Sequence, residues 1–167
     1  MSLVVLLQTS CLIAFAVLLC AAAWQDLRTL LIADGISIAI IAVFAVWALT
    51  GLCVGDLPLS DVAWSVACAA ALFAVGAAAF AVGGIGGGDV KLLAAASLFA
   101  GPSLLLEYGL VTALAGGLLG VAVLAGAPLG AMAGAGEPSP SRWRRSLPYG
   151  PAIAVGGLWV ALFRAVG

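Results

Sequence analysis

The stretch LVVLLQTSCLIAFAVLLCAAAW, residues 3–24, decides the class of fold. It is an uncharged apolar run, and a helix needs about 20 such residues to cross the hydrocarbon core of a bilayer. No basic segment precedes the run and no small-residue cleavage site follows it. We therefore expect a retained transmembrane helix instead of a signal peptide.

Similar apolar runs follow along the rest of the chain. We expect five further spans, over residues 36–55, 62–82, 90–106, 108–126 and 148–166. Gly101 and Pro102 interrupt the fourth run, where a helix should end or kink. The only long polar loop covers residues 128–146. The expected fold is an all-α membrane protein, a bundle of about six transmembrane helices that forms one polytopic domain over residues 1–167, without a soluble domain.

The composition excludes several classes of protein. Apolar residues make up 65% of the chain and charged residues 8%, against about 45–50% and 25% in an average globular protein. The net charge of −1 offers no basic face to nucleic acid. Catalysis by histidine is excluded because the chain has none. The four cysteines form no CxxC pair, so we expect no zinc site, no other metal and no cofactor.

The basic residues predict how the helices are oriented in the membrane. With six spans, the turns after the first, third and fifth face the same side. Five of the six bases lie there, namely Arg28, Lys91, Arg142, Arg144 and Arg145. By the positive-inside rule this side is cytoplasmic, and both termini are outside. We therefore expect a multi-pass protein of the inner (cytoplasmic) membrane.

Asp26 and Asp89 stand out among the few charged residues. Asp26 closes the first span and Asp89 opens the fourth, so both are expected on the cytoplasmic side at similar depth. Taken singly, each could be a marker of the membrane boundary. Two carboxylates facing each other in a low-dielectric cleft share a proton, and together they supply a general base and a general acid. Such a pair can activate water against a peptide carbonyl.

The glycines before Asp89 suit this chemistry. Gly86, Gly87 and Gly88 have no side chains that would keep an extended peptide away from the acid. The alternative interpretation is a flexible turn between the third and fourth helices.

Three motifs carry a resemblance to a known family. Gly86-Gly87-Gly88-Asp89-Val90-Lys91 resembles the GxGD signature of the type IV prepilin peptidases, which are membrane aspartic proteases. Asp26-Leu27-Arg28-Thr29, with Ile32, resembles the first acidic motif of that family. Pro148-Tyr149-Gly150 resembles the motif that opens its last helix. The likeness is greatest to the short peptidases of tight-adherence (Flp-type) pilus systems.

The resemblance implies that Asp26 and Asp89 are the catalytic pair. It also implies cleavage of the leader of a prepilin or pseudopilin on the cytoplasmic side, just before the hydrophobic helix of the substrate. Such a helix could dock laterally against the bundle. The candidates for substrate-binding or supporting roles are Gly86, Gly88, Arg28 and Lys91. Lys91 is two positions from Asp89, so on a helix the two side chains point in different directions.

The chain departs from the family pattern at Ala33-Asp34, where the family has Pro-Asn. Asp34 is therefore a third acid near the expected site and a rival to Asp26. Asp26 is favoured because it directly follows the apolar helix and carries the Asp-x-Arg context.

Other interpretations of the sequence stay open. A small transporter or a pilus-assembly partner could use the paired acids to bind an ion or relay protons, although the chain lacks the repeated halves that are frequent in transporters. A GxGD protease acting on another substrate is a further alternative, against which the Pro-Tyr-Gly motif argues. The spacings Gly116/Gly120 and Gly126/Gly130 permit close helix contacts, either within one bundle or in a homo-oligomer.

Overall fold

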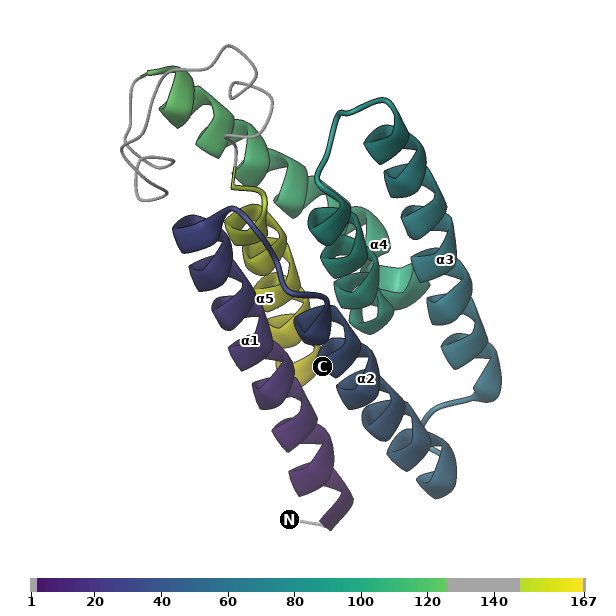
Figure 1. The fold of residues 1–167 in the computed structure, drawn as a ribbon. Helices are drawn as coiled ribbons and strands as arrows, with labels where there is room; N and C mark the ends of the chain where they lie inside the picture. The colour runs from purple at the N-terminus through teal and green to yellow at the C-terminus, as the bar shows by residue number, and fades with distance from the viewer. Residues whose placement is uncertain (1–2, 126–147, 167) are drawn as a thin grey trace.

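The computed structural model describes residues 3–125 and 148–166, and within them it contains five helices and no strand. The helices are α1 (Leu3–Thr29), α2 (Asp34–Val54), α3 (Leu59–Ala81), α4 (Gly87–Leu124) and α5 (Gly150–Val166) (Figure 1). Four of them, α1 to α4, are long and apolar enough to cross a membrane. The all-helical membrane class is confirmed. The polar loop over residues 128–146, with Arg142, Arg144, Arg145 and Gly130, lies outside the described residues, as does Gly126.

The expected count of six spans is not confirmed, because the fourth and fifth expected runs lie within the single helix α4. The break predicted at Gly101 and Pro102 is present. Gly101 has φ 58° and ψ −172°, and Pro102 cannot donate a backbone hydrogen bond. The two halves of α4 fold back on each other and form a V (Figure 1).

A single hydrogen bond demonstrates this reversal of α4. The Tyr108 hydroxyl donates to the Leu93 carbonyl at 3.1 Å, across 15 positions of sequence. In a straight helix, 15 residues would separate the two by about 22 Å. The two halves of α4 therefore lie side by side as the two arms of a helical hairpin with almost no loop.

Arg164 of α5 stabilises the break in α4. Its Nε donates to the Phe99 carbonyl at 3.1 Å and its Nη2 donates to the Ala100 carbonyl at 3.3 Å. The last carbonyls of a helix have no partner within the helix, and the half-buried guanidinium supplies one. A Cβ at Gly101 would lie 2.9 Å from Ser65 Oγ and 3.2 Å from Arg164 Nη2, so only glycine fits this position without displacing a neighbour.

The first half of α4 forms the centre of the bundle. Every residue from Ala94 to Gly101 is buried. Phe99 stacks on Phe15 of α1, with ring centroids 4.2 Å apart, and meets Phe44 of α2 edge-on at 5.3 Å. Small residues allow helices to pack closely in a membrane. Gly116 of α4 is such a residue, and it faces Tyr149 and Ala152. In this chain Gly116 therefore serves a contact within the bundle.

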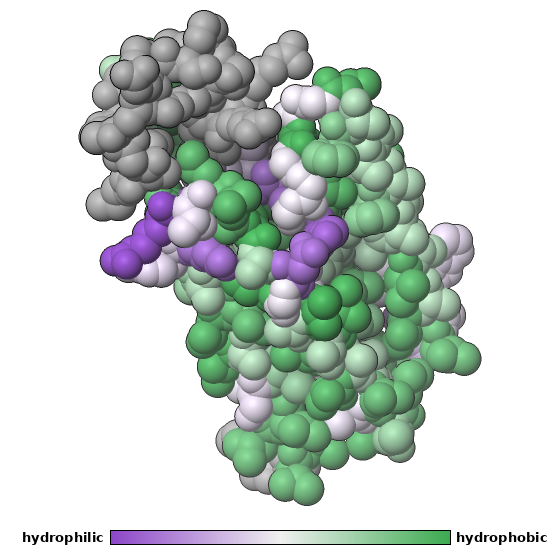
Figure 2. Space-filling model, viewed as in Figure 1, coloured by the Kyte–Doolittle hydropathy of each residue, from purple (hydrophilic) through white to green (hydrophobic). Residues whose placement is uncertain are grey.

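Hydrophilic residues gather near one end of the molecule. Figure 2 shows an apolar surface along most of the helices and hydrophilic patches beside the part drawn in grey. Large side chains such as Val17, Leu114 and Val75 are each more than 60% exposed. This outer surface suits contact with lipid tails.

Candidate active site

Several helix ends meet at one end of the bundle. This end holds the last turn of α1 and the first turns of α2, α4 and α5 (Figure 1). We call it the carboxylate end, because Asp26 lies in the last turn of α1 and Asp89 in the first turn of α4. Helix α1 continues past the apolar run to Thr29, so Asp26 belongs to the helix and does not follow it.

Asp26 is buried against the start of α5. Asp26 is only 4% exposed, and its Oδ2 accepts a hydrogen bond of 2.7 Å from the backbone N–H of Gly150. The first N–H groups of a helix lack partners within it and favour negative charge. A Cβ at Gly150 would lie 2.7 Å from Asp26 Cβ and 2.8 Å from Oδ2. This close approach requires glycine at position 150.

Asp89 folds back over the start of its own helix. Its carboxylate lies beside the backbone N–H of Gly86, the N-cap residue of α4. A Cβ at Gly86 would lie 2.6 Å from Asp89 Oδ2, so glycine is required there as well. The other oxygen, Oδ1, is buried and has no hydrogen-bond partner among the described residues. Buried oxygens without a partner are rare, which makes this one a candidate for a role in the reaction.

The structure brings Asp26 and Asp89 together, although they are far apart in sequence. They are close enough for the charge of Asp26 to act on Asp89. Each also lies beside a backbone N–H at the start of a helix: Asp26 accepts a hydrogen bond from Gly150 of α5, and Asp89 lies beside Gly86 at the start of α4. Two acids arranged in this way can share a proton, as the general acid and base of peptide hydrolysis do.

Asp34, the rival acid, lies elsewhere. It begins α2 and forms an ion pair with Lys91, with Nζ and Oδ2 2.7 Å apart and both side chains largely exposed. Lys91 therefore turns away from Asp89, as expected from its position two residues along the helix. No pattern in the sequence predicts the pair itself, which joins residues 57 positions apart.

The comparison with family models decides which family this chain belongs to. The model of the type IV leader peptidase family matches residues 13–124, more than half of the chain and a range that contains both Asp26 and Asp89. The chain belongs to the type IV leader peptidase family. Searches of curated proteins and of solved structures found no match to the chain.

Membership in this family indicates that the chain is a protease of the leader-peptidase type. Its several apolar helices suggest a multi-pass membrane protein. Membership confirms the resemblance of the chain to such a family. It also favours the peptidase over the transporter and the assembly partner. The match ends before Pro148-Tyr149-Gly150, whose likeness to the family therefore rests on the residues themselves.

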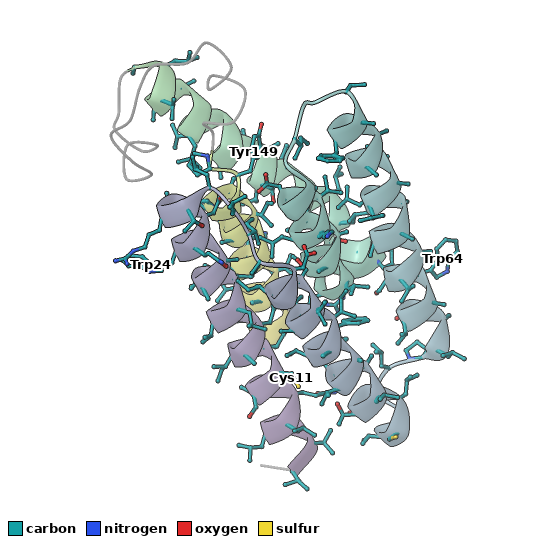
Figure 3. The ribbon with its side chains drawn as sticks, viewed as in Figure 1. Cys11, Trp24, Trp64 and Tyr149 are labelled. Atoms are coloured by element: carbon teal, nitrogen blue, oxygen red, sulfur yellow. The ribbon has the colours of Figure 1, made fainter. Side chains whose placement is uncertain are left out.

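Two other candidate residues of the leader peptidase lie around the pair. Arg28 stacks over the ring of Trp24 at 4.4 Å, on the outer face of α1 and away from the carboxylates (Figure 3). The structure does not bring Arg28 to Asp26. Gly88 packs against the α1–α2 connection, because a Cβ there would lie 3.2 Å from both Cβ and the carbonyl oxygen of Ile32. Gly88 thus allows the start of α4 to approach that connection closely.

The role of the Gly150 N–H is not predicted by the sequence. The available signal was a glycine at the start of an apolar run, between Pro148 and Pro151, but nothing in it indicates which carboxylate that N–H would meet. Tyr149 lies at the same end of the bundle (Figure 3). Among the described residues, no group of three or more His, Cys, Asp or Glu side chains could hold a metal ion.

Proposed function

We propose that this leader peptidase is a membrane aspartic endopeptidase that removes the leader of prepilin-like proteins at the cytoplasmic face of the membrane. The observation that carries the proposal is the convergence of Asp26 and Asp89 at one end of the bundle, each beside the backbone N–H of a glycine at the start of a helix. Family membership supports peptidase activity, and the paired acids supply its chemistry without a cofactor.

The reaction follows from two carboxylates that share one proton. The ionised carboxylate takes a proton from water while the water oxygen bonds to the scissile carbonyl carbon, and the protonated carboxylic acid donates to the carbonyl oxygen. The tetrahedral intermediate then collapses, the C–N bond breaks, and the leaving nitrogen receives a proton from the pair. The products are one carboxylic acid and one amine. The unpartnered Oδ1 of Asp89 suits the attacking water.

The proposed side of cleavage rests on the positions of the basic residues. Arg28 and Lys91 lie at the carboxylate end, whereas Arg164 lies at the opposite end beside Phe99 and Ala100. Basic residues mark cytoplasmic ends, which supports a cytoplasmic site. A peptide bond just before the membrane helix of a substrate would reach the same depth.

The proposal is tested by co-expressing the chain with a prepilin precursor and following the precursor in isolated membranes. We expect cleavage by the unaltered chain, and no cleavage by Asp26→Asn or Asp89→Asn at equal abundance in the membrane. Asp61→Asn is the matched control, an exposed acid in the first turn of α3, at the opposite end. It should cleave as the unaltered chain does. Full processing by either dyad variant would contradict the proposal.

A further inference from the structure

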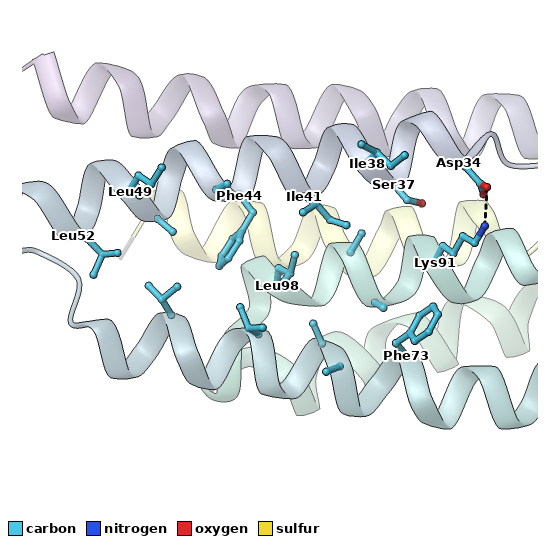
Figure 4. A pocket seen from close by; sticks show the side chains of 18 residues that line it. Asp34, Ser37, Ile38, Ile41, Phe44, Leu49, Leu52, Phe73, Lys91 and Leu98 are labelled. Atoms are coloured by element: carbon cyan, nitrogen blue, oxygen red, sulfur yellow. Dashed lines mark hydrogen bonds and ion pairs between the residues drawn. The ribbon is translucent and has the colours of Figure 1, made fainter.

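A long groove runs between α2 and α3, with the first half of α4 as its floor (Figure 4). It encloses about 810 Å³. Along α2 its lining extends from Asp34 to Leu52, which corresponds to about 27 Å at 1.5 Å per residue. This length is close to the thickness of the hydrocarbon core, about 30 Å. The groove is therefore nearly long enough to cross the hydrocarbon core of a bilayer.

The groove exists because α2 and α3 pack against other helices and not against each other. The main contacts of α2 are with α1 and α4, and those of α3 are with α4. Consecutive helices joined by a short connection are usually close neighbours in a bundle. The lining includes small residues from all three helices, namely Ala45, Ala48, Ala69, Ala70, Ala94 and Ala95. Small residues of this kind allow another helix to approach closely.

The groove is polar only where it reaches the carboxylate end. The Asp34–Lys91 ion pair lies there, and Ser37 lies one helical turn further along α2 (Figure 4). Ser37 is 4% exposed, and its Oγ has no hydrogen-bond partner among the described residues. A buried hydroxyl without a partner is unfavourable, so this position indicates a ligand with a polar group. Lys91 follows Asp89 by two residues on α4, so the polar end of the groove lies at the same end of the bundle as the paired acids, on another side of α4.

We infer that this groove binds the apolar helix of the substrate, a single transmembrane segment preceded by an extended leader. The inference rests on the proposed function and adds the docking site to it. The substrate helix lies along the groove with one face on α4, and its leader passes the Asp34–Lys91 pair to reach Asp26 and Asp89.

Charge complementarity favours this occupant and this direction. Because the leader precedes the helix, the N-terminus of the substrate helix lies at the carboxylate end. Its first backbone N–H groups lack partners, and the helix dipole places positive charge there. The Asp34 carboxylate and the Ser37 hydroxyl both accept hydrogen bonds. A lipid acyl chain could fill the apolar part, but it would leave Ser37 without a partner.

Photocrosslinking tests the docking site. The crosslinking amino acid p-benzoylphenylalanine is placed at Ile41 or Val66, which line the groove, or at Val17 or Leu114, which are exposed and apolar but outside it. The Asp89→Asn background keeps the precursor intact. We expect covalent adducts with the prepilin precursor from both groove positions and from neither control. Equal adducts from all four positions, adducts from the controls alone, or adducts with lipid alone would overturn the inference.

Filling the groove gives an independent measurement. Ala45→Trp and Ala70→Trp place a large ring in the groove, whereas Ala42→Trp and Ala71→Trp place it on neighbouring exposed positions that do not line it. We expect the groove variants to raise KM for the precursor by about tenfold or more with little change in kcat, and the controls to leave both unchanged. An unchanged KM in the groove variants, or a loss confined to kcat, would overturn the inference.

These results can be separated from a failure of the proposed function. If the unaltered chain does not cleave the precursor, the proposed function fails. If it cleaves the precursor but groove positions give no adducts and groove filling has no effect on KM, only the docking site is wrong.

Discussion

The backbone N–H of Gly150 donates a hydrogen bond of 2.7 Å to Oδ2 of Asp26, and so the start of α5 holds a carboxylate at the end of α1. The contact leaves no room for a side chain at position 150, since a Cβ would lie within 3.0 Å of three atoms of Asp26. The arrangement of the paired acids therefore depends on how closely two backbones approach.

Gly150→Ala should reduce the rate of leader cleavage by about 10²-fold, because a displacement of about 1 Å in a catalytic group has effects of this size. Gly117→Ala is the control, since a Cβ there meets nothing within 4 Å. Both variants are compared in a cleavage assay at equal abundance in the membrane. A normal rate in Gly150→Ala would show that the contact with Asp26 is not required.

Gly86→Ala should lower kcat by about tenfold to 10²-fold, because its Cβ would displace Oδ2 of Asp89. Gly86 is exposed at the start of α4, so protein abundance should change little. Gly35→Ala, at a position with open space around it, should have the same kcat as the unaltered chain. Equal kcat values for the two variants would contradict the role given to Gly86.

Asp34→Ala should raise KM for the precursor while keeping kcat within about threefold, because Asp34 is placed at the docking groove and not in the catalytic pair. The exposed pair with Lys91 contributes about 0–1 kcal/mol to stability, so the fold should persist. The readout is a kcat and KM measurement on purified protein. Complete loss of kcat would transfer the first catalytic role from Asp26 to Asp34.

Arg164→Met should lower the free energy of unfolding by roughly 2–4 kcal/mol, because it removes two charge-assisted hydrogen bonds to the carbonyls of Phe99 and Ala100. Arg28→Met removes an exposed cation–π contact with Trp24 and should lower it by less than about 1 kcal/mol. Unfolding of both variants is measured in the same detergent. Equal losses would show that the break in α4 needs no cap.

The placement of Asp26 and Asp89 at one end of the bundle could be predicted from the sequence because each stands at the end of an apolar run. Composition and run length also predicted an all-helical membrane protein. The break at Gly101 was predicted from Gly-Pro, but the count of six helices is not confirmed. The two arms of α4 are joined by a single residue with non-helical angles, and sequence patterns do not show whether such a junction separates two helices.

The contacts between helices could not be predicted in the same way. The Asp34–Lys91 pair depends on how α2 is rotated relative to α4, and that rotation follows from packing around Phe44 and Phe99. Likewise, the meeting of Gly150 with Asp26 depends on the position of α5 against α1. The sequence pattern within one helix predicts neither contact, since both depend on how the surfaces of different helices fit together.

The polar groups beside Asp26 and Asp89 are main-chain amides, which every amino acid except proline possesses. A point mutation at Gly150 or Gly86 therefore leaves the amide in place and alters only its position. Genetic screens for inactive variants should accordingly recover replacements of the acids themselves and of the glycines that permit close approach, and few replacements of polar neighbours. In this enzyme the positions of the reacting carboxylates depend on residues that have no side chain.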